Sequence, residues 1–141
     1  MGWVESAPYF CTTSETAQDV TVKYIETAIG SLPAHKFEAW AGATIAMVNN
    51  DTAQHDLCYF LEVYINDYIS CIVPTSRKQI EHITREILHG IHDIFPPSME
   101  DSKDPILAKK LCKGDGSFET NKCLLGFNFD GVNKTIWLEE D

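Results

Sequence analysis

The sequence predicts an α+β fold in which helices cover one face of an antiparallel sheet. Two short runs rich in aromatic and β-branched residues, YFLEVYI and YISCIV, follow one another and are typical of paired strands. The segment after them repeats isoleucine at steps of three and four, which indicates a long amphipathic helix. The expected order is helix, hairpin, long helix, short helix, hairpin, with no internal repeat.

The length and composition suit one domain, or a fragment of a larger protein, and exclude several classes of protein. The chain has 141 residues, of which 44% are hydrophobic, enough for a globular core. No apolar run approaches the ~18 residues that a membrane span needs, and the N-terminus has no basic-then-apolar signal. The five cysteines are odd in number and form no C-x-x-C pair, which favours reduced thiols. We therefore expect an intracellular protein, cytoplasmic or nuclear, that is neither secreted nor bound to a membrane.

The charge balance is strongly acidic. The chain carries 21 Asp and Glu against 11 Lys and Arg, a net charge of −10. Neutralisation of phosphates needs clustered Lys and Arg, so this chain alone is a poor nonspecific binder of nucleic acid.

The N-terminal part predicts one clear helix and one weakly patterned segment. In residues 12–30, Thr12 and Glu15 fit a capping box and Gly30 stands where a helix stops. Residues 31–58 contain Pro33 and a short apolar run, from which we expect a short helix or strand.

The central part predicts a hairpin and the long helix. The strands are residues 59–65 and 68–73, with residues 66–67 as the turn, because Asn and Asp tolerate left-handed backbone angles. Ser76 and Gln79 form a second capping box, and the two prolines at 96–97 end the helix. The isoleucines of its expected packing face are Ile80, Ile83, Ile87, Ile91 and Ile94.

The C-terminal part predicts a short helix and a second hairpin. Asp104 is the expected N-cap, Pro105 stands in the first turn, and Gly114 follows the helix end. Residues 122–138 read as a hairpin that turns near Asp130 and Gly131.

The long helix also carries a histidine face. His82, Glu86 and His89 recur at i, i+4 and i+7, with His92 close by, and two histidines with a carboxylate are able to bind zinc. The spacing is not H-E-x-x-H, and these residues lie opposite the isoleucine stripe. We favour a solvated polar face and keep metal binding as an alternative.

Three segments carry a resemblance to a known family. GWVESAPYF (2–10), LEVYINDYIS (61–70) and KCLLGFNFD (122–130) resemble, in that order, three consecutive motifs of reverse transcriptases, in the form found in retrotransposon polyproteins. Residues 75–97 and 104–138 also look like such polyproteins, so the resemblance covers nearly the whole chain. It implies a partial palm, with a ferredoxin-like sheet, over residues 1–98. Residues 99–141 would be a short helix and a primer-grip-like hairpin that lead toward a thumb.

The resemblance also implies an activity and a site. The activity is RNA-directed DNA polymerisation, a nucleotidyl transfer that uses Mg²⁺, a template-primer and dNTP. Residues 2–10 would open the helix beneath the incoming nucleotide, residues 64–67 would be the Y-x-D-D turn, and residues 125–126 would hold the primer strand. The implied residues are Gly2, Ser6, Pro8, Phe10, Tyr64, Ile65, Leu125 and Gly126 for nucleotide and primer binding, and Asn66 and Asp67 for catalysis, with Asp67 as the metal ligand.

Two departures from the family pattern bear on activity. A further metal-binding Asp is expected on a strand upstream of Gly2, and Asn66 stands where the family has Asp. A unit charge ~4 Å away is worth about 4 kcal/mol at an effective dielectric near 20, so its loss costs on the order of 10³-fold in rate. We therefore expect the chain to be inactive alone.

Two alternatives to a polymerase fragment remain open. The first is a non-catalytic binding or interaction protein that retains a palm-like fold, whose exposed edge contacts a protein partner. For the polymerase fragment itself, the missing upstream strand would expose a sheet edge, through which we expect the isolated chain to self-associate. The second is a metal-binding helical module that uses the histidine face. Taken alone, residues 64–67 would be a plain β-turn between buried strands.

Overall fold

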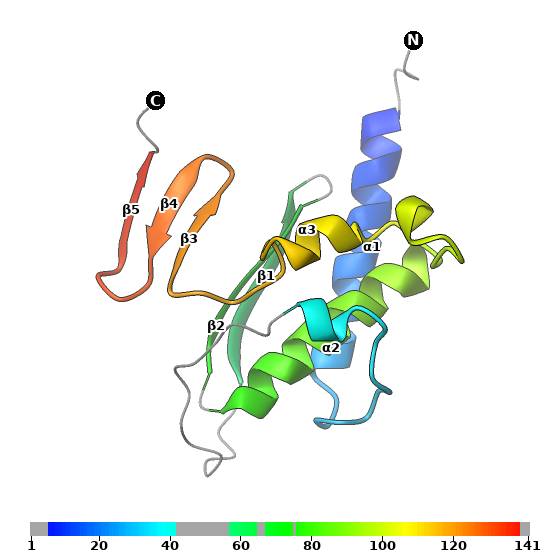
Figure 1. Ribbon diagram of the computed structural model, residues 1–141, viewed down its shortest axis with the longest axis horizontal. Helices are drawn as coiled ribbons and strands as arrows, with labels where there is room; N and C mark the ends of the chain where they lie inside the picture. Colours follow the sequence, from blue (N-terminus) through cyan, green and yellow to red (C-terminus); the bar gives the residue numbers. More distant parts are fainter. Residues whose placement is uncertain (1–5, 42–56, 65–66, 75, 139–141) are drawn as a thin grey trace.

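The computed structural model describes residues 6–41, 57–64, 67–74 and 76–138, with side chains from residue 10 onward (Figure 1). Within these ranges the fold is α+β, as predicted, and no helix is long and apolar enough to cross a membrane. The elements in order are α1 (Ser6–Ile25), a 3-10 turn at Glu38–Trp40, β1 (Cys58–Tyr64), β2 (Asp67–Val73), α2 (Arg77–Ile94), a 3-10 turn at Asp101–Lys103, α3 (Ala108–Cys112), β3 (Asn121–Leu124), β4 (Phe127–Asp130) and β5 (Thr135–Leu138).

Helix α1 begins earlier and ends earlier than predicted. The capping box at Thr12 was wrong, because Thr12 and the residues around it lie inside the helix. Pro8 is tolerated since it stands in the first turn, where a backbone N–H has no intrahelical acceptor. Phe10 packs against Phe95 beyond the end of α2, with ring centroids 5.8 Å apart. Gly30 lies in a turn after the helix, at φ 85°.

The weakly patterned segment forms little regular structure in its described part. Residues 31–41 contain only the short 3-10 turn. The remainder of the segment predicted as a helix or strand, residues 42–56, lies outside the described residues.

The predicted hairpin is confirmed, with its turn one residue earlier. Tyr64 pairs with Asp67, so Asp67 is the first residue of β2 and the connection is residues 65–66, which lie outside the described residues. The inner face carries Leu61, buried, together with Tyr68 and Ile72. On the outer face Phe60 and Val73 are exposed.

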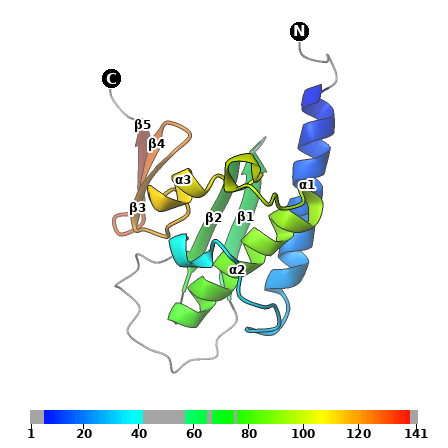
Figure 2. The same ribbon diagram turned by 45° about the vertical axis from the view of Figure 1, so that its right-hand side comes forward.

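Helix α2 lies against the inner face of the hairpin, and its N-cap is as predicted. The Ser76 side chain accepts a hydrogen bond from the backbone N–H of Gln79. Ile83 of the isoleucine stripe is fully buried against Leu61 of β1 and Ile25 of α1. Helix α1 crosses α2 beside the same sheet, so both helices pack on one face of the hairpin (Figures 1 and 2).

The C-terminal part differs from the prediction in two ways. Helix α3 begins at Ala108 and not at Asp104, because the Asp104 carboxylate accepts from the backbone N–H of Ile106 and holds the chain extended there. Gly114 does follow the helix end, at φ 98°. The expected single hairpin is a three-stranded meander, β3–β4–β5, which forms a sheet separate from β1–β2.

The meander has two turns, of which the sequence reading found only the second. Leu125 and Gly126 connect β3 to β4 with φ of 53° and 80°, the two positive angles that a type I′ turn requires. At the predicted second turn, the Asp130 carboxylate accepts from the backbone N–H groups of Val132 and Asn133. Leucine is an uncommon residue at positive φ, so the residues at 125–126 do not strongly indicate a turn in the sequence.

We expect the crossing of α1 and α2 to depend on Gly90. A Cβ at this position would lie 3.0 Å from the Thr21 Cα and even closer to its hydroxyl oxygen. Gly90→Ala should therefore lower the free energy of unfolding by about 1–3 kcal/mol in urea titrations, although Gly→Ala in a helix is otherwise stabilising. Lys78→Ala on the exposed side of α2 is the control and should have little effect. An unchanged or more stable Gly90→Ala protein would contradict the close crossing.

Candidate functional site

A cavity of about 620 Å³ brings together residues from all three sequence motifs. It lies between α1, β2 and α2 on one side and residues 105–125 on the other. Phe10, Asp67 and Leu125, which come from the first, second and third motif, all line it. The structure therefore places one predicted site residue from each motif around a single space.

The other predicted site residues are placed less fully. Tyr64 is 58% exposed and pairs with Asp67 at the end of the hairpin. Gly126 completes the turn next to Leu125. Ser6 and Pro8 lie in the first turn of α1, but their side chains are outside the description. Gly2, Ile65 and Asn66 lie outside the described residues.

The described residues of the cavity do not present a donor set that fits a pair of Mg²⁺ ions. Hard cations need several anionic oxygens on rigid elements, and two-metal sites share carboxylates between both ions. Asp67 is the motif's one described carboxylate here, and Asp115 lies on the opposite wall. Across the described ranges, no three His, Cys, Asp or Glu side chains gather where they could hold a metal ion.

The cavity wall carries three buried hydroxyl groups that the sequence reading missed. The hydroxyl oxygens of Ser14, Ser70 and Thr84 have no hydrogen-bond partner in the described part of the chain. Much of the remaining wall is apolar, with Ile87 and Ile91 of α2 among its residues. The three hydroxyls come from α1, β2 and α2, so no local spacing in the sequence could have grouped them.

Lys122 ties the meander to the cavity wall. Its ammonium group donates to the backbone carbonyls of Gly114 at 2.9 Å, Asp115 at 3.1 Å and Ser117 at 2.5 Å. Burial lowers the pKa of this lysine, and the nearby Glu119 and Asp115 oppose that shift. These contacts connect β3 to the turn that follows α3.

The expectation of a solvated histidine face on α2 was wrong. His82 and Glu86 are 4% and 0% exposed, because α1 covers this side of α2 as well. His82 Nε2 donates to the Ile25 carbonyl at 3.0 Å, and its Nδ1 lies 3.2 Å from a Glu86 carboxyl oxygen. Burial raises the pKa of Glu86, while His82, His89 and Arg85 work against that rise. Helix α2 is thus buried on two sides, one apolar and one polar.

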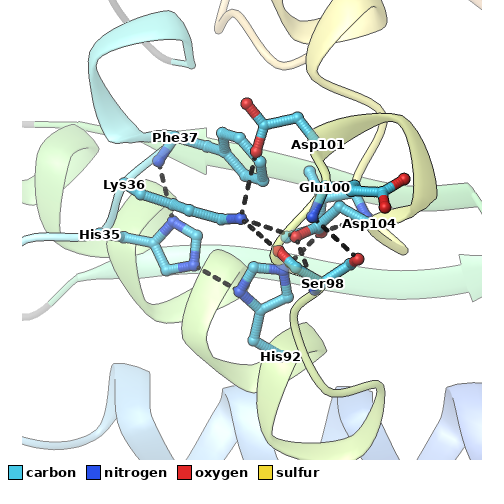
Figure 3. Close-up of polar contacts among 9 residues, drawn as sticks. His35, Lys36, Phe37, His92, Ser98, Glu100, Asp101 and Asp104 are labelled. Atoms are coloured by element: carbon cyan, nitrogen blue, oxygen red, sulfur yellow. Dashed lines mark hydrogen bonds and ion pairs between the residues drawn. The ribbon is translucent and has the colours of Figure 1, made fainter.

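A second polar cluster joins the end of α2 to two loops (Figure 3). The Asp104 carboxylate, fully buried, accepts from His92 Nε2 at 2.7 Å and from Lys36 Nζ at 2.8 Å. The backbone N–H groups of Ile106 and Ser98 also donate to it, at 2.9 and 3.3 Å. Burial alone would raise the pKa of Asp104, but these hydrogen bonds hold it below its usual range.

One obligatory hydrogen-bond donor determines which ring nitrogens of the two histidines in this cluster carry protons. The backbone N–H of Phe37 can only donate, and it lies 3.1 Å from His35 Nδ1. We infer that the proton of His35 is on Nε2, which donates to His92 Nδ1 at 2.9 Å, so that His92 keeps its proton on Nε2 for Asp104. Burial lowers the pKa of His35 to about 4, because a protonated His35 would be poorly solvated and would lie beside Lys36 and two further imidazoles, those of His92 and His89.

This cluster positions one wall of the cavity. It fixes residues 35–37 against α2, and a paired Arg85–Glu38 contact at 2.7 Å holds the following turn. Phe37 then packs with Ala41, Leu88 and Ile106 in one buried cluster. The last three of these residues also line the cavity, so the polar cluster acts on the site through packing.

We expect His35 to make stability depend on pH. The unfolded imidazole has an ordinary pKa near 6.5, so between about pH 6.5 and pH 4 the unfolded chain binds a proton that the folded chain does not. The free energy of unfolding should therefore fall as pH falls through this window, by on the order of 1–2 kcal/mol from this residue. His35→Gln, which does not titrate, should show a shallower decline between pH 7 and pH 4.5 in urea titrations. Parallel declines in the two proteins would show that His35 does not titrate as inferred.

In comparisons with known proteins, no family model, no curated protein and no solved structure matches the chain.

Proposed function

We propose that this chain is a fragment of a retroelement RNA-directed DNA polymerase, most of its palm and a primer-grip-like hairpin, and that it is inactive alone. The observation that carries the proposal is the meeting of Phe10, Asp67 and Leu125 around one cavity. These residues were selected from three motifs by sequence resemblance, and they stand 57 and 58 positions apart (67 − 10 and 125 − 67). Their convergence is expected of motifs that serve one template-primer site.

Two features of the fold support the same proposal. Helix α2 packs on the β1–β2 hairpin, in which Asp67 is the first residue after the turn; this is the place that the resemblance gives to residues 76–94. The turn at Leu125 and Gly126 is a tight two-residue connection at the cavity, as a loop that contacts a primer strand would be.

The site chemistry explains why this fragment would not polymerise. Phosphoryl transfer to a primer hydroxyl needs dense negative charge from the protein to hold its metal ions in place. Here the turn offers Asp67 alone, and Asn66 contributes a neutral amide. One carboxylate does not hold two metal ions, so no catalytic step is assigned to the chain.

One surface favours a second candidate function, that of a non-catalytic interaction protein with a palm-like fold. The outer face of the hairpin exposes Phe60, Tyr64 and Val73, at 56%, 58% and 67%. Phe60 and Val73 are diagonal neighbours across the two strands, and an exposed apolar patch is typical of protein contact sites. This candidate expects a stable protein whose partner covers that face.

A reconstitution experiment tests the polymerase proposal. The protein segment encoded by the DNA upstream of Met1 would be expressed in one polypeptide with the chain. On the proposal, this segment supplies the strand with the further metal-binding Asp. We expect primer extension only when this segment is combined with Asn66→Asp, at a rate on the order of 10³-fold above the same assembly with Asn66. Adding Asp67→Asn to the active combination should abolish extension and serves as its control.

Two outcomes would contradict the proposal. The first is primer extension by the 141 residues alone, because one carboxylate would then suffice. The second is a folded reconstituted assembly, with Asn66→Asp, that does not extend a primer. The second outcome together with a retained partner on the outer face of the hairpin would favour the interaction protein.

A further inference from the structure

Two strand edges border the same cavity. Among the described strands, β2 pairs with β1 alone and β3 pairs with β4 alone, so each has one edge with no partner strand. The cavity of about 620 Å³ is lined by residues 67–70 of β2 and by residues 122–125, from β3 and the turn after it. Figure 1 shows β3 as the strand of the meander on the side of the hairpin. The cavity therefore lies where the two sheets stand apart.

The lining residues are consecutive, which places the cavity beside each strand and not over one face of a sheet. Successive side chains of a strand point to opposite faces, so a cavity over one face is lined by every second residue. Tyr68 packs in the inner-face cluster of the hairpin, whereas Ile69 belongs to the outer face, and both line the cavity. On β3 the neighbours Lys122 and Cys123 line it together in the same way. A space that meets both faces of a strand lies along its edge.

The edge of β2 is open for pairing. Within the described residues, no backbone group outside the hairpin hydrogen-bonds to residues 67–73. Edge strands that avoid pairing usually carry a lysine, a proline or a bulge. Residues 67–70 contain neither lysine nor proline, and the one charge of β3, Lys122, has its ammonium bound to three backbone carbonyls.

The cavity has the size and the walls that a short strand needs. A strand in a packed sheet takes up roughly 160 Å³ per residue, from a strand spacing of about 4.8 Å, a rise of about 3.3 Å per residue and a layer spacing of about 10 Å. A volume of about 620 Å³ therefore holds roughly four residues. Ile87, Leu88 and Ile91 of α2 form an apolar wall, on which one face of such a strand would be buried.

We propose that this cavity takes up an extended segment of another protein, in which apolar and polar residues alternate. The segment pairs with β2 on one side and with β3 on the other, so that the two sheets become one, in the order β1, β2, partner, β3, β4, β5. Its apolar residues contact the α2 wall, and its backbone N–H and C=O groups find partners on both edges.

Strand pairing at this cavity does not depend on the proposed function, because it follows from the two edges and the space between them. It also differs from docking on the outer face of β1–β2. There a partner would contact Phe60 and Val73, which do not line the cavity.

A synthetic peptide tests the pairing. The probe is acetyl-KTVTVTK-amide, and isothermal titration calorimetry with the full chain should show saturable binding of one peptide per chain. Successive N–H groups of a strand point to opposite edges. One control peptide is N-methylated at the valines and a second at the threonines, so each has one edge blocked. Each should raise the Kd at least about tenfold, because the partner pairs on both sides.

A matched pair of protein variants locates the site. Ile69→Lys places a charge at the edge of β2 beside the cavity and should raise the Kd at least about tenfold. Val73→Lys makes the same change on the same strand and the same face, away from the cavity, and should leave the Kd unchanged. Circular dichroism should show that both variants fold alike. In the complex, amide hydrogen exchange should slow at residues 67–70 and 122–125 together.

Several results would overturn the proposal. The first is no saturable binding of the peptide up to about 1 mM. The second is a methylated peptide that binds as well as the unmodified one. The third is equal weakening by Val73→Lys and Ile69→Lys, which would place the peptide on the outer face. The fourth is loss of peptide binding in the longer polypeptide with the upstream segment, since the same chain would then fill the cavity.

Discussion

The buried carboxylate of Asp104 is the interaction on which the arrangement around α2 depends. It collects hydrogen bonds from Lys36, from His92 and from two backbone N–H groups, and so joins two loops to one end of the helix. A buried charge is tolerated only when paired in this way, and removal of one partner leaves it costly. His35 joins the cluster through its hydrogen bond to His92. Phe37, two residues after His35, packs with the apolar residues beside the cavity, so the position of this loop affects the cavity wall. The Asp104 cluster thus helps to set the shape of the cavity through apolar packing, although the charged groups of the cluster do not line the cavity.

The elements that depend on local pattern were predictable from the sequence, and those that depend on long-range contacts were not. The hairpin β1–β2, the N-cap at Ser76 and the packing of Ile80 and Ile83 follow from periodicity and short-range capping. The buried histidine face did not follow, because the sequence gives no sign that α1 covers the second side of α2 through Gly90. The start of α3 was mispredicted because the Asp104 carboxylate accepts from the backbone N–H of Ile106, two residues on, and also from the distant Lys36 and His92.

For the candidate site, the sequence supplied the residues and the structure supplied their grouping. Phe10, Asp67 and Leu125 could be selected by motif, but only the fold brings them to one cavity. The hydroxyls of Ser14, Ser70 and Thr84 belong to no motif, and three-dimensional packing alone assembles them. Asn66 was informative from the sequence, because a neutral amide at that position lacks the charge that the proposed two-metal chemistry would need. Among the described residues, the outer face of the β1–β2 hairpin exposes the apolar side chains of Phe60, Tyr64 and Val73 to new contacts.

We propose that this chain descends from the palm of a retroelement polymerase, and one measurement tests this descent directly. The most direct measurement is the sequence of the DNA immediately upstream of the codon for Met1, translated in the same frame. An apolar strand that bears an Asp, followed closely by Gly2 and the first motif, is the result that descent from a polymerase predicts. A non-coding region with its own promoter, and no such strand in any frame, would contradict it.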